Sequence, residues 1–276
     1  MAVVLITGSS SGIGKYTALE MARRGHRVFA SMRNLESARF IRADARKAQL
    51  TLEILQLDVT DPASVTNAVQ QVAREAGAVE VLVNNAGTAS AGVVEDFTDQ
   101  EIRDVFETNF FGAVRTTRAV LPAMRARRSG TIIMMSSSSG LRTFPFVSVY
   151  SASKFALEAI SNGLRYELRP FGIRVVLIEP GNFRTRAGSN MHFPKRTASG
   201  SGEATADPMY RTLAKRPPHR FPVFPFGDAH DVASLAAHIG ESDDPRARYL
   251  IGKDAEYWMG LDSEEFEELV RQRMKV

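Results

Sequence analysis

A tyrosine and a lysine four residues apart, Tyr150 and Lys154 in the stretch YSASK, are the side chains of this sequence best suited to acid–base chemistry. In a helix, a spacing of four places both side chains on one face. A tyrosine alone has a pKa of about 10 and is a poor proton carrier at neutral pH, but a neighbouring ammonium group favours the phenolate and lowers that pKa. The pair by itself is weak evidence, because the same spacing occurs by chance in many helices.

A run of four serines at residues 136–139 follows the apolar stretch TIIMM. Serine runs are usually flexible linkers, but this run comes directly after a segment that predicts a buried strand. Its position favours a strand end at which one hydroxyl group takes part in chemistry. The residues alone do not say which serine carries that hydroxyl.

The glycine-rich stretch TGSSSGIG, residues 7–14, lies between the first expected strand and the first expected helix, which is the context of a dinucleotide-binding turn. Its glycines would permit a tight turn and a close backbone approach, and a pyrophosphate would lie on the exposed amides at the positive end of the helix. The alternative is a merely tight strand–helix connection. The cofactor-binding residues predicted in this turn are Gly8, Ser10, Ser11, Gly12, Ile13 and Gly14.

Three further motifs end expected strands: LDVTD at 57–61, NNAG at 84–87 and EPGNFRT at 179–185. Open α/β sheets bind ligands at the carboxyl ends of their strands. There, Asp58 is placed to accept a hydrogen bond from an adenine amine. The cofactor contacts predicted in these motifs are Asp58, Val59, Asn85, Ala86, Gly87, Pro180, Gly181, Phe183 and Thr185.

The end of the second expected strand, ASMRN at 30–34, bears on the choice of cofactor. An NAD-preferring enzyme usually offers an acidic residue there to the ribose hydroxyls. Here Met32 takes that place and Arg33 follows it. Without the acid a 2′-phosphate is not repelled, a guanidinium can pair with it bidentately, and Ser11 offers a hydroxyl contact. We therefore predict NADP(H) in preference to NAD(H), with Arg33 as a contact.

The elements that must position these residues alternate along the chain. Apolar segments of strand length lie at 3–7, 27–31, 52–57, 79–83, 131–135 and 173–178, and segments with helical spacing lie at 16–24, 64–75, 99–125 and 150–168. Continuous apolar strands indicate a parallel sheet that is covered on both faces. The alternation predicts an α/β fold, a Rossmann-type doubly wound parallel sheet, in a single domain over residues 1–276.

The region 184–226 has no clear strand and is rich in prolines, glycines and aromatics, which predicts an irregular substrate lid. A helix at 228–241, a strand at 248–251 and a helix at 263–274 are expected after it. The apolar residues predicted to contact substrate are Met191, Phe193, Met209, Tyr210, Phe221 and Phe224, with FPF at 144–146 as another wall. The alternative is that these aromatics only anchor the segment to the domain.

The composition is that of a soluble globular protein, with 44% hydrophobic and 24% charged residues. The chain has no cysteine, which excludes disulfides and thiolate metal sites and fits a cytoplasmic location; no metal is predicted. The apolar start is too short for a signal peptide or a membrane span. A net charge of +4 could attract nucleic acid, but the basic residues are dispersed in short groups and no nucleic-acid motif accompanies them.

Together, TGSSSGIG, NNAG, TNFFG, the serines after IIMM, YSASK and PGNFRT occur in the order and with the gaps of the short-chain dehydrogenase/reductase family, which this chain resembles most strongly over residues 2–185. The resemblance implies that Tyr150 is the general acid/base and that Ser137, rather than its nearest rival Ser138, binds the substrate oxygen. It also implies that Lys154 lowers the tyrosine pKa and holds the nicotinamide ribose. Asn109 would position a water that links Lys154 to solvent.

The resemblance extends to Thr185, which matches a threonine that contacts the cofactor. Phe183 departs from the family, which usually has a valine or isoleucine at that position. Stretches such as VFASMRN and SKFALEAISNGLRYELRPFGI are similar to the 17β-hydroxysteroid and retinol dehydrogenase-like group. That similarity implies interconversion of an alcohol and a ketone on a bulky apolar substrate, in a homodimer or homotetramer. A reductase of a small ketone or a 3-oxoacyl compound, and a cofactor-sensing regulatory protein, are the alternatives.

Overall fold

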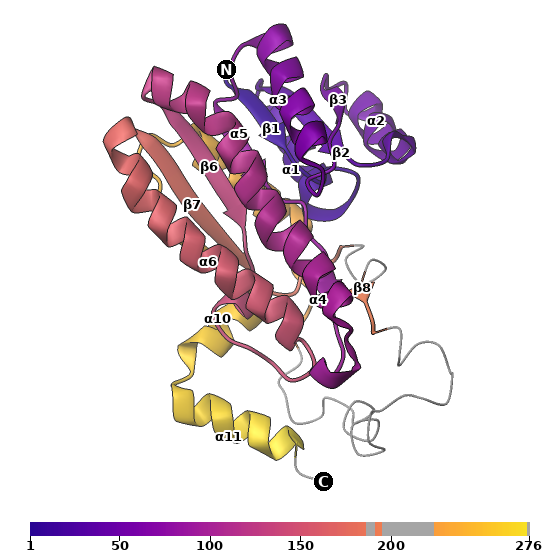
Figure 1. Cartoon of the computed structure of the whole chain (residues 1–276), viewed down its shortest axis with the longest axis vertical. Coiled ribbons are helices and arrows are strands. Elements are labelled where there is room, and N and C mark those ends of the chain that lie inside the picture. The colour runs from indigo at the N-terminus through magenta and orange to yellow at the C-terminus, as the bar shows by residue number, and fades with distance from the viewer. Residues whose placement is uncertain (186–190, 195–223, 275–276) are drawn as a thin grey trace.

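A parallel β-sheet runs through the centre of the computed structural model, which describes residues 1–185, 191–194 and 224–274 (Figure 1). Within the described residues its strand order is β3-β2-β1-β4-β6-β7-β9. The strands are β1 (Val3–Ile6), β2 (Arg27–Met32), β3 (Glu53–Gln56), β4 (Val81–Asn84), β6 (Gly130–Met135), β7 (Ile173–Pro180) and β9 (Arg248–Ile251). Side chains of β1 alternate between two cores, because Leu5 faces one and Val4 and Ile6 face the other.

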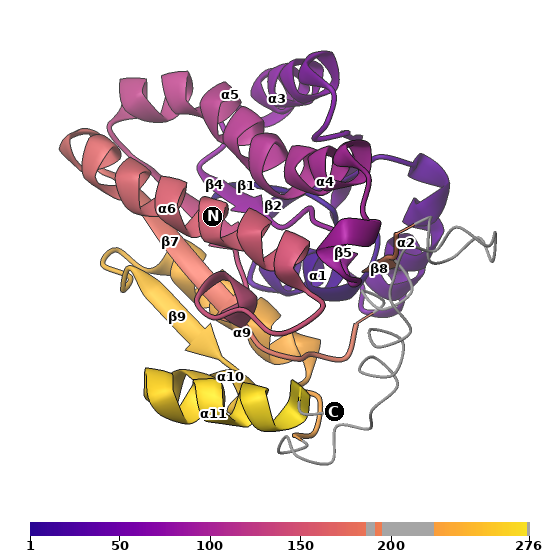
Figure 2. The same cartoon turned by 60° about the horizontal axis from the view of Figure 1, so that its bottom comes forward.

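Helices cover both faces of this sheet, so the predicted doubly wound α/β fold is confirmed (Figure 2). The core that contains Val4 and Ile6 is closed by α1 (Gly12–Arg23), α2 (Ala38–Lys47) and α9 (Ala229–Glu241). The core that contains Leu5 is closed by α3 (Pro62–Ala76), α5 (Gly112–Arg127) and α6 (Ser148–Leu168). Neither α2 nor the later helix α10 (Lys253–Gly260) was predicted from the sequence. Helix α11 (Ser263–Met274) ends the described chain and has the predicted bounds.

The segment expected as one helix over 99–125 is interrupted. It consists of α4 (Asp99–Phe106), a π-helical turn η3 (Glu107–Phe111) and then α5. Helix α4 begins at a capping box in which Thr98 and Glu101 satisfy each other's backbone amides. A π turn widens the helix by one residue, and such turns occur frequently at functional sites. This turn contains Asn109.

The predicted lid region is described only in part, and Met209, Tyr210 and Phe221 lie outside the described residues. The expectation that it contains no strand is wrong at one point, because β8 (Met191–His192) pairs in parallel with β5 (Ala89–Ser90). The region leaves and rejoins the domain at one place. There the amide of Arg184 donates to the carbonyl of Gly227 at 3.0 Å, and the amide of Gly227 donates to the carbonyl of Asn182 at 2.9 Å.

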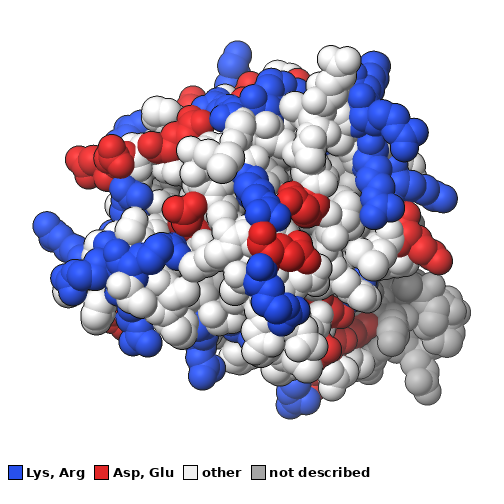
Figure 3. Space-filling view, turned by 90° about the horizontal axis from the view of Figure 1, so that it is seen from above, with Lys and Arg blue, Asp and Glu red and all other residues white. Residues whose placement is uncertain are grey.

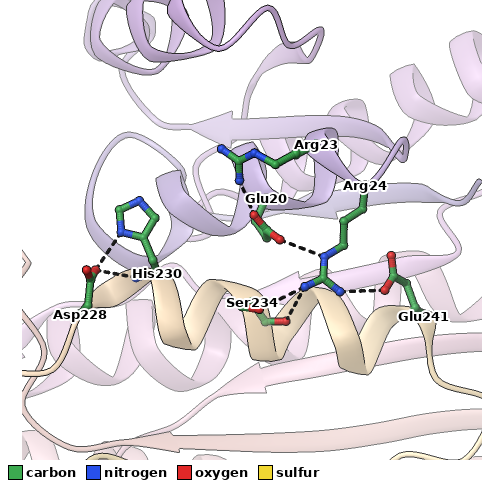
Figure 4. Close-up of polar contacts among 7 residues, drawn as sticks. All are labelled: Glu20, Arg23, Arg24, Asp228, His230, Ser234 and Glu241. Carbon is green, nitrogen blue, oxygen red and sulfur yellow. Dashed lines mark hydrogen bonds and ion pairs between the residues drawn. The ribbon is translucent and has the colours of Figure 1, made fainter.

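Polar contacts attach α9 to α1 on the outside of the sheet (Figure 4). The guanidinium of Arg24 bonds Glu20 at 2.9 Å on its own helix, and across the interface it bonds Glu241 at 2.8 Å and the Ser234 hydroxyl at 3.1 Å. These contacts are partly exposed, so we expect each to contribute about 1 kcal/mol or less. The buried apolar residues of α9 carry most of this packing.

The basic residues do not form a single surface on the face shown in Figure 3, where Lys and Arg side chains are interspersed with Asp and Glu. None of the helices in the described part of the chain combines the length and the apolar character needed to cross a membrane.

Candidate active site

The ends of β1 and β4 meet at the point where the strand order reverses, which is the ligand-binding position of an open α/β sheet. The hydroxyl of Thr7 accepts hydrogen bonds from the amides of Asn85 and Ala86, both at 3.0 Å. The side-chain amide of Asn85 donates to the carbonyls of Thr7 at 2.9 Å and Gly8 at 3.0 Å. The predicted TGSSSGIG and NNAG motifs are therefore bonded to each other.

Glycines line this junction because side chains would not fit. Gly8 has a φ of +71°, and a Cβ there would lie 2.8 Å from the Cα of Ala86. Gly12 has a φ of +57°, and a Cβ would approach Thr185 to 3.3 Å. A Cβ at Gly14 would run into the Asn85 amide and the Gly8 carbonyl. The result is a cradle of bare backbone at the first turn of α1, which fits the pyrophosphate of a dinucleotide.

A hollow of about 460 Å³ lies over this cradle. Ser10, Ser11, Gly12 and Thr185 are among the residues that line it. Lys15, Arg184 and residues of α2 complete the lining, although the sequence motifs did not single out Lys15 or Arg184. The ammonium of Lys15 is paired with the Asp44 carboxylate at 2.5 Å. The Asp44 carboxylate also lines the hollow and offsets the charge of Lys15, so Arg184 and the positive end of α1 are the features that make the hollow suited to an anionic group.

The strand ends differ in how they present the predicted cofactor contacts. The carboxylate of Asp58 accepts hydrogen bonds from the amide and the hydroxyl of Thr60, at 2.9 Å and 2.8 Å. At the end of β2, the side chain of Met32 is buried in the core and Arg33 is exposed. Met32 at the position usually held by an acidic residue is therefore turned into the core, and Arg33 is the first exposed side chain there.

Phe183 is buried, and a Cβ on Gly227 would collide with its ring. The larger side chain is thus accommodated by Gly227, which pairs with Phe183 in an isolated parallel bridge. Next to it, a Cβ on Gly181 would collide with the carboxylate of Asp254, which is 4% exposed and accepts from the Asn182 amide at 2.8 Å. Asp254 holds the turn after Pro180 in place, and it lies outside every motif used in the sequence analysis.

Three of the predicted catalytic side chains meet at the ends of β6 and α6. Ser137 follows β6, is 9% exposed and shares a hydrogen bond with Tyr150. Its hydroxyl also accepts from the Ser139 amide at 3.1 Å and lies 3.4 Å from the Pro180 carbonyl. Lys154 is 5% exposed, and its ammonium donates to the Met135 carbonyl at 2.8 Å and lies 5.8 Å from the centre of the Tyr150 ring.

The other serines of the run are placed differently. The Ser136 amide donates to the carbonyl of Ile178 at 2.8 Å, which extends the contact between β6 and β7. Ser138 and Ser139 form the short 3-10 helix η4 (Ser138–Gly140), as expected for residues that shape a turn.

Burial controls the acid–base properties of this group. Burial raises the pKa of the Tyr150 phenol above its usual value, and the hydrogen bond from Ser137 opposes that rise. Burial also lowers the pKa of Lys154 to about 8, and the carboxylate of Glu158 opposes that fall. The expected lowering of the tyrosine pKa is therefore wrong for the protein chain by itself.

Asn109 is held rigidly at the π turn. Its side-chain oxygen accepts from the Thr88 amide at 2.8 Å, and its side-chain nitrogen donates to the Thr88 carbonyl and the Ser153 hydroxyl, both at 2.9 Å. A Cβ at Gly87 would lie 3.3 Å from the Asn109 side-chain oxygen and 3.7 Å from the Lys154 ammonium. Gly87 therefore keeps the space between Asn109 and Lys154 open.

A parallel doubly wound sheet with a glycine cradle at its topological switch is the arrangement of a dinucleotide-binding α/β protein. The chain belongs to the short-chain dehydrogenase family, whose model matches residues 2–193. It is a dehydrogenase/reductase of this family, whose members bind NAD(P).

Several known proteins are similar to this chain. The 3-ketodihydrosphingosine reductase of Bacteroides thetaiotaomicron is 41% identical over 76% of this chain and 74% of its own length. The NADPH-dependent 3-dehydrocapnine reductase of Ornithobacterium rhinotracheale is 38% identical over 91% and 88%. Human retinol dehydrogenase 8 is 43% identical over 64% of this chain, which spans 58% of that enzyme, and this similarity confirms the predicted resemblance to retinol dehydrogenase-like members.

Among solved structures, a short-chain dehydrogenase from Streptomyces avermitilis is similar along nearly the whole chain. Its TM-score is 0.78 with 31% identity, and the match covers 99% of this chain and 96% of that one.

Proposed function

We propose that this protein is an NADP(H)-dependent oxidoreductase that interconverts a secondary alcohol and a ketone on a bulky apolar substrate. The observation that carries the proposal is the meeting of the Ser137 hydroxyl, the Tyr150 phenol and the Lys154 ammonium beside the glycine cradle. A hydride donor held in the cradle would lie near two hydroxyl groups that can hold and protonate a carbonyl oxygen.

In this proposal the protein supplies arrangement and the proton, and the nicotinamide supplies the hydride chemistry. Ser137 donates a hydrogen bond to the substrate oxygen and stabilises it as negative charge develops. Tyr150 donates its phenolic proton to that oxygen during reduction and accepts it during oxidation. The ammonium of Lys154 stabilises the resulting phenolate and offers a donor to the cofactor ribose, while Asn109 borders the opening between Lys154 and solvent.

The proposed preference for NADP(H) rests on the exposed guanidinium of Arg33 at the end of β2, where an acidic residue would repel a 2′-phosphate. The NADPH named for the 3-dehydrocapnine reductase supports it. Fluorescence titration of both reduced cofactors tests the preference, and replacing Arg33 with alanine should weaken NADPH binding by about tenfold while leaving NADH binding unchanged. Tighter binding of NADH by the unmodified protein would contradict the preference.

The proposed apolar substrate is supported by two relatives, which are named a 3-ketodihydrosphingosine reductase and a 3-dehydrocapnine reductase. The aromatic residues near the loop that joins Ser137 to Tyr150 include both anchored and exposed side chains. Phe144 in this loop packs edge-on against Trp258 and Phe266, each with 5.4 Å between ring centres. Phe224 packs against Tyr257 at 5.3 Å, which favours an anchoring role for that side chain. Phe193, in contrast, is 58% exposed.

A substrate panel is the experiment that tests this function. Long-chain 3-ketones, steroid and retinoid ketones or aldehydes, 3-oxoacyl thioesters and small ketones are each supplied with NADPH and with NADH, and consumption of the reduced cofactor is followed by absorbance. We expect turnover of a bulky apolar carbonyl with NADPH, and a loss of about a thousandfold or more in the Tyr150→Phe variant. Turnover confined to small ketones would favour the alternative reductase.

A homodimer or homotetramer is supported by apolar side chains on the outer helices. Phe111 on η3 is 48% exposed and Phe155 on α6 is 42% exposed, and these two elements are in contact. Exposed aromatic residues on adjacent helices are a frequent mark of an interface. Light scattering at micromolar concentration tests this proposal, and a monomer would reject it.

A further inference from the structure

Glu158 lies four residues after Lys154 on α6, so Tyr150, Lys154 and Glu158 form one stripe along the helix. The side chain of Glu158 is almost completely buried, at 6% exposure for the residue. It faces a second buried carboxylate, Glu179 of β7, which is 1% exposed. Buried carboxylates are rare unless they are paired, so this pair needs an explanation that the catalytic residues do not provide.

Arg248 of β9 contacts both carboxylates. One guanidinium nitrogen lies 2.6 Å from a Glu179 oxygen and the other lies 3.3 Å from a Glu158 oxygen. The Arg248 side chain is 41% exposed, so the cluster extends from the inside of the protein to its surface. Arg165, further along α6, also faces Glu179.

Glu158 adjoins the active site at Gly140. A Cβ there would lie 2.9 Å from the Ser136 hydroxyl, 3.2 Å from Cγ of Glu158 and 3.2 Å from Cβ of Lys154. The aliphatic parts of both charged residues, one turn apart on α6, therefore pack against the end of the serine run. Both residues are at most 6% exposed, and charges in such a poorly solvated region interact strongly with one another.

Two carboxylates this close in a buried region do not both ionise readily. Burial raises the pKa of Glu179 to about 7, and the charge of Glu158 raises it further in the same direction. Burial also raises the pKa of Glu158, but Ser136, Arg248 and Lys154 all favour its ionised form. Glu179 is therefore the member of the pair that keeps its proton up to about pH 7, and Glu158 is the member whose ionised form its neighbours favour.

We propose that Glu158 is a positioning residue for the reaction: its carboxylate keeps the buried Lys154 in the charged form, and Glu179 with Arg248 holds that carboxylate in place. The inference rests on the proposed function. Burial alone drives Lys154 towards the neutral amine, and Glu158 is the group that opposes this. Removing the carboxylate but keeping its shape should leave the active site intact and let Lys154 lose its proton at a lower pH.

The test is the pH dependence of kcat in the Glu158→Gln variant, measured with the best substrate from the panel. Near pH 6, where Lys154 is charged in both proteins, we expect the variant to have wild-type activity. Near pH 9 we expect its kcat to be about tenfold lower than that of the wild type. The reason is that the alkaline limb, the fall of kcat as Lys154 loses its proton, moves down by about one pH unit. Glu158→Asp, which keeps the charge, should retain most of the alkaline activity. A uniform loss at every pH would mean a structural role and would overturn the proposal.

A matched control sharpens the test. Glu167→Gln makes the same chemical change at an exposed position of α6 and should leave the alkaline limb where it is in the wild type. An equal downward shift in Glu158→Gln and Glu167→Gln would contradict the specific role of Glu158.

A second readout does not depend on turnover. NMR of side-chain nitrogen-labelled lysine, with the Lys154 signal assigned by Lys154→Arg, reports the titration of this ammonium group directly. We expect the Lys154 titration to shift to lower pH in Glu158→Gln and to be unchanged in Glu167→Gln. If the panel finds no substrate, the proposed function fails while this measurement still decides the inference; an unchanged titration in Glu158→Gln overturns it.

Discussion

The cofactor cradle and the acid–base group lie at the same edge of the sheet but are built in different ways. The cradle consists of bare backbone and short neutral groups, and Thr7, Asn85 and Ala86 fix its shape through hydrogen bonds. The acid–base group consists of the ionisable side chains Tyr150, Lys154 and Glu158, of which Lys154 and Glu158 are almost completely buried and influence each other's charge. The first region is therefore sensitive to volume and backbone conformation, and the second to charge and pH.

The largest effect is expected from Tyr150→Phe, which removes the proposed proton donor but keeps the ring. Turnover should fall by about a thousandfold or more, in the range for loss of a general acid/base. Cofactor affinity should stay close to the wild-type value, because the cradle is formed by other residues. Steady-state kinetics and fluorescence titration on the same preparation check both parts, and full residual turnover would exclude Tyr150 from the role.

Ser137→Ala should reduce kcat by about a hundredfold, as expected when one donor to a developing oxyanion is lost. The same substitution at Ser138 or Ser139 should have a much smaller effect, because those residues form the turn of η4. Comparing kcat for the three alanine variants tests which serine is catalytic. A larger loss at Ser138 than at Ser137 would reassign it.

Gly8→Ala tests the cradle alone. The added Cβ meets the Ala86 Cα at 2.8 Å, and a φ of +71° is unfavourable for alanine. We expect NADPH to bind about tenfold more weakly, with the pH dependence of the remaining activity unchanged. Gly163→Ala on α6, where a Cβ has only the Glu167 carboxylate at 3.8 Å, is the matched control and should not weaken binding. Isothermal titration of both variants measures the difference.

The smallest effect on turnover, and the clearest effect on stability, is expected from Glu179→Gln. A carboxyl whose pKa is about 7 in the folded protein binds its proton more tightly than in the unfolded chain. Its contribution to stability is therefore complete below about pH 4.5 and is lost as the pH rises through about 7. Between about pH 5 and pH 8, the free energy of unfolding should fall by about 1–3 kcal/mol less in the variant than in the wild type. Urea unfolding of both proteins at the two pH values measures this difference. An equal fall in the free energy of unfolding in both proteins would show that Glu179 does not titrate in this range.

The sequence predicted the central strands well because each is a short continuous apolar run with a turn signal after it. It missed α2, whose buried residues Ala38, Ile41 and Ala45 are mostly small and lie among arginines and lysine. It also expected one uninterrupted helix across Asn109. Hydrophobic periodicity does not report the single extra residue of a π turn, which depends on what the helix packs against.

Hydrophobic periodicity also did not predict which side chain at the end of β2 is available to a ligand. Met32 and Arg33 are adjacent in sequence, and whether either side chain meets a ligand depends on which one turns into the core beneath α2. The pairing of β5 with β8 is a similar case, because two-residue strands carry too few side chains to produce a pattern.

The sequence by itself determined the parts of this protein that depend on local spacing: the glycine turn, the run of serines that follows β6, and the one-turn spacing of Tyr150 and Lys154 on α6. These are set within a few residues, so they can be read along the chain. Only the tertiary structure decided that Glu179 and Arg248 meet Glu158, because these residues come from different strands and become neighbours only when β7 pairs with β6 and β9. The burial that shifts the pKa values of Lys154 and Glu179 arises from that packing.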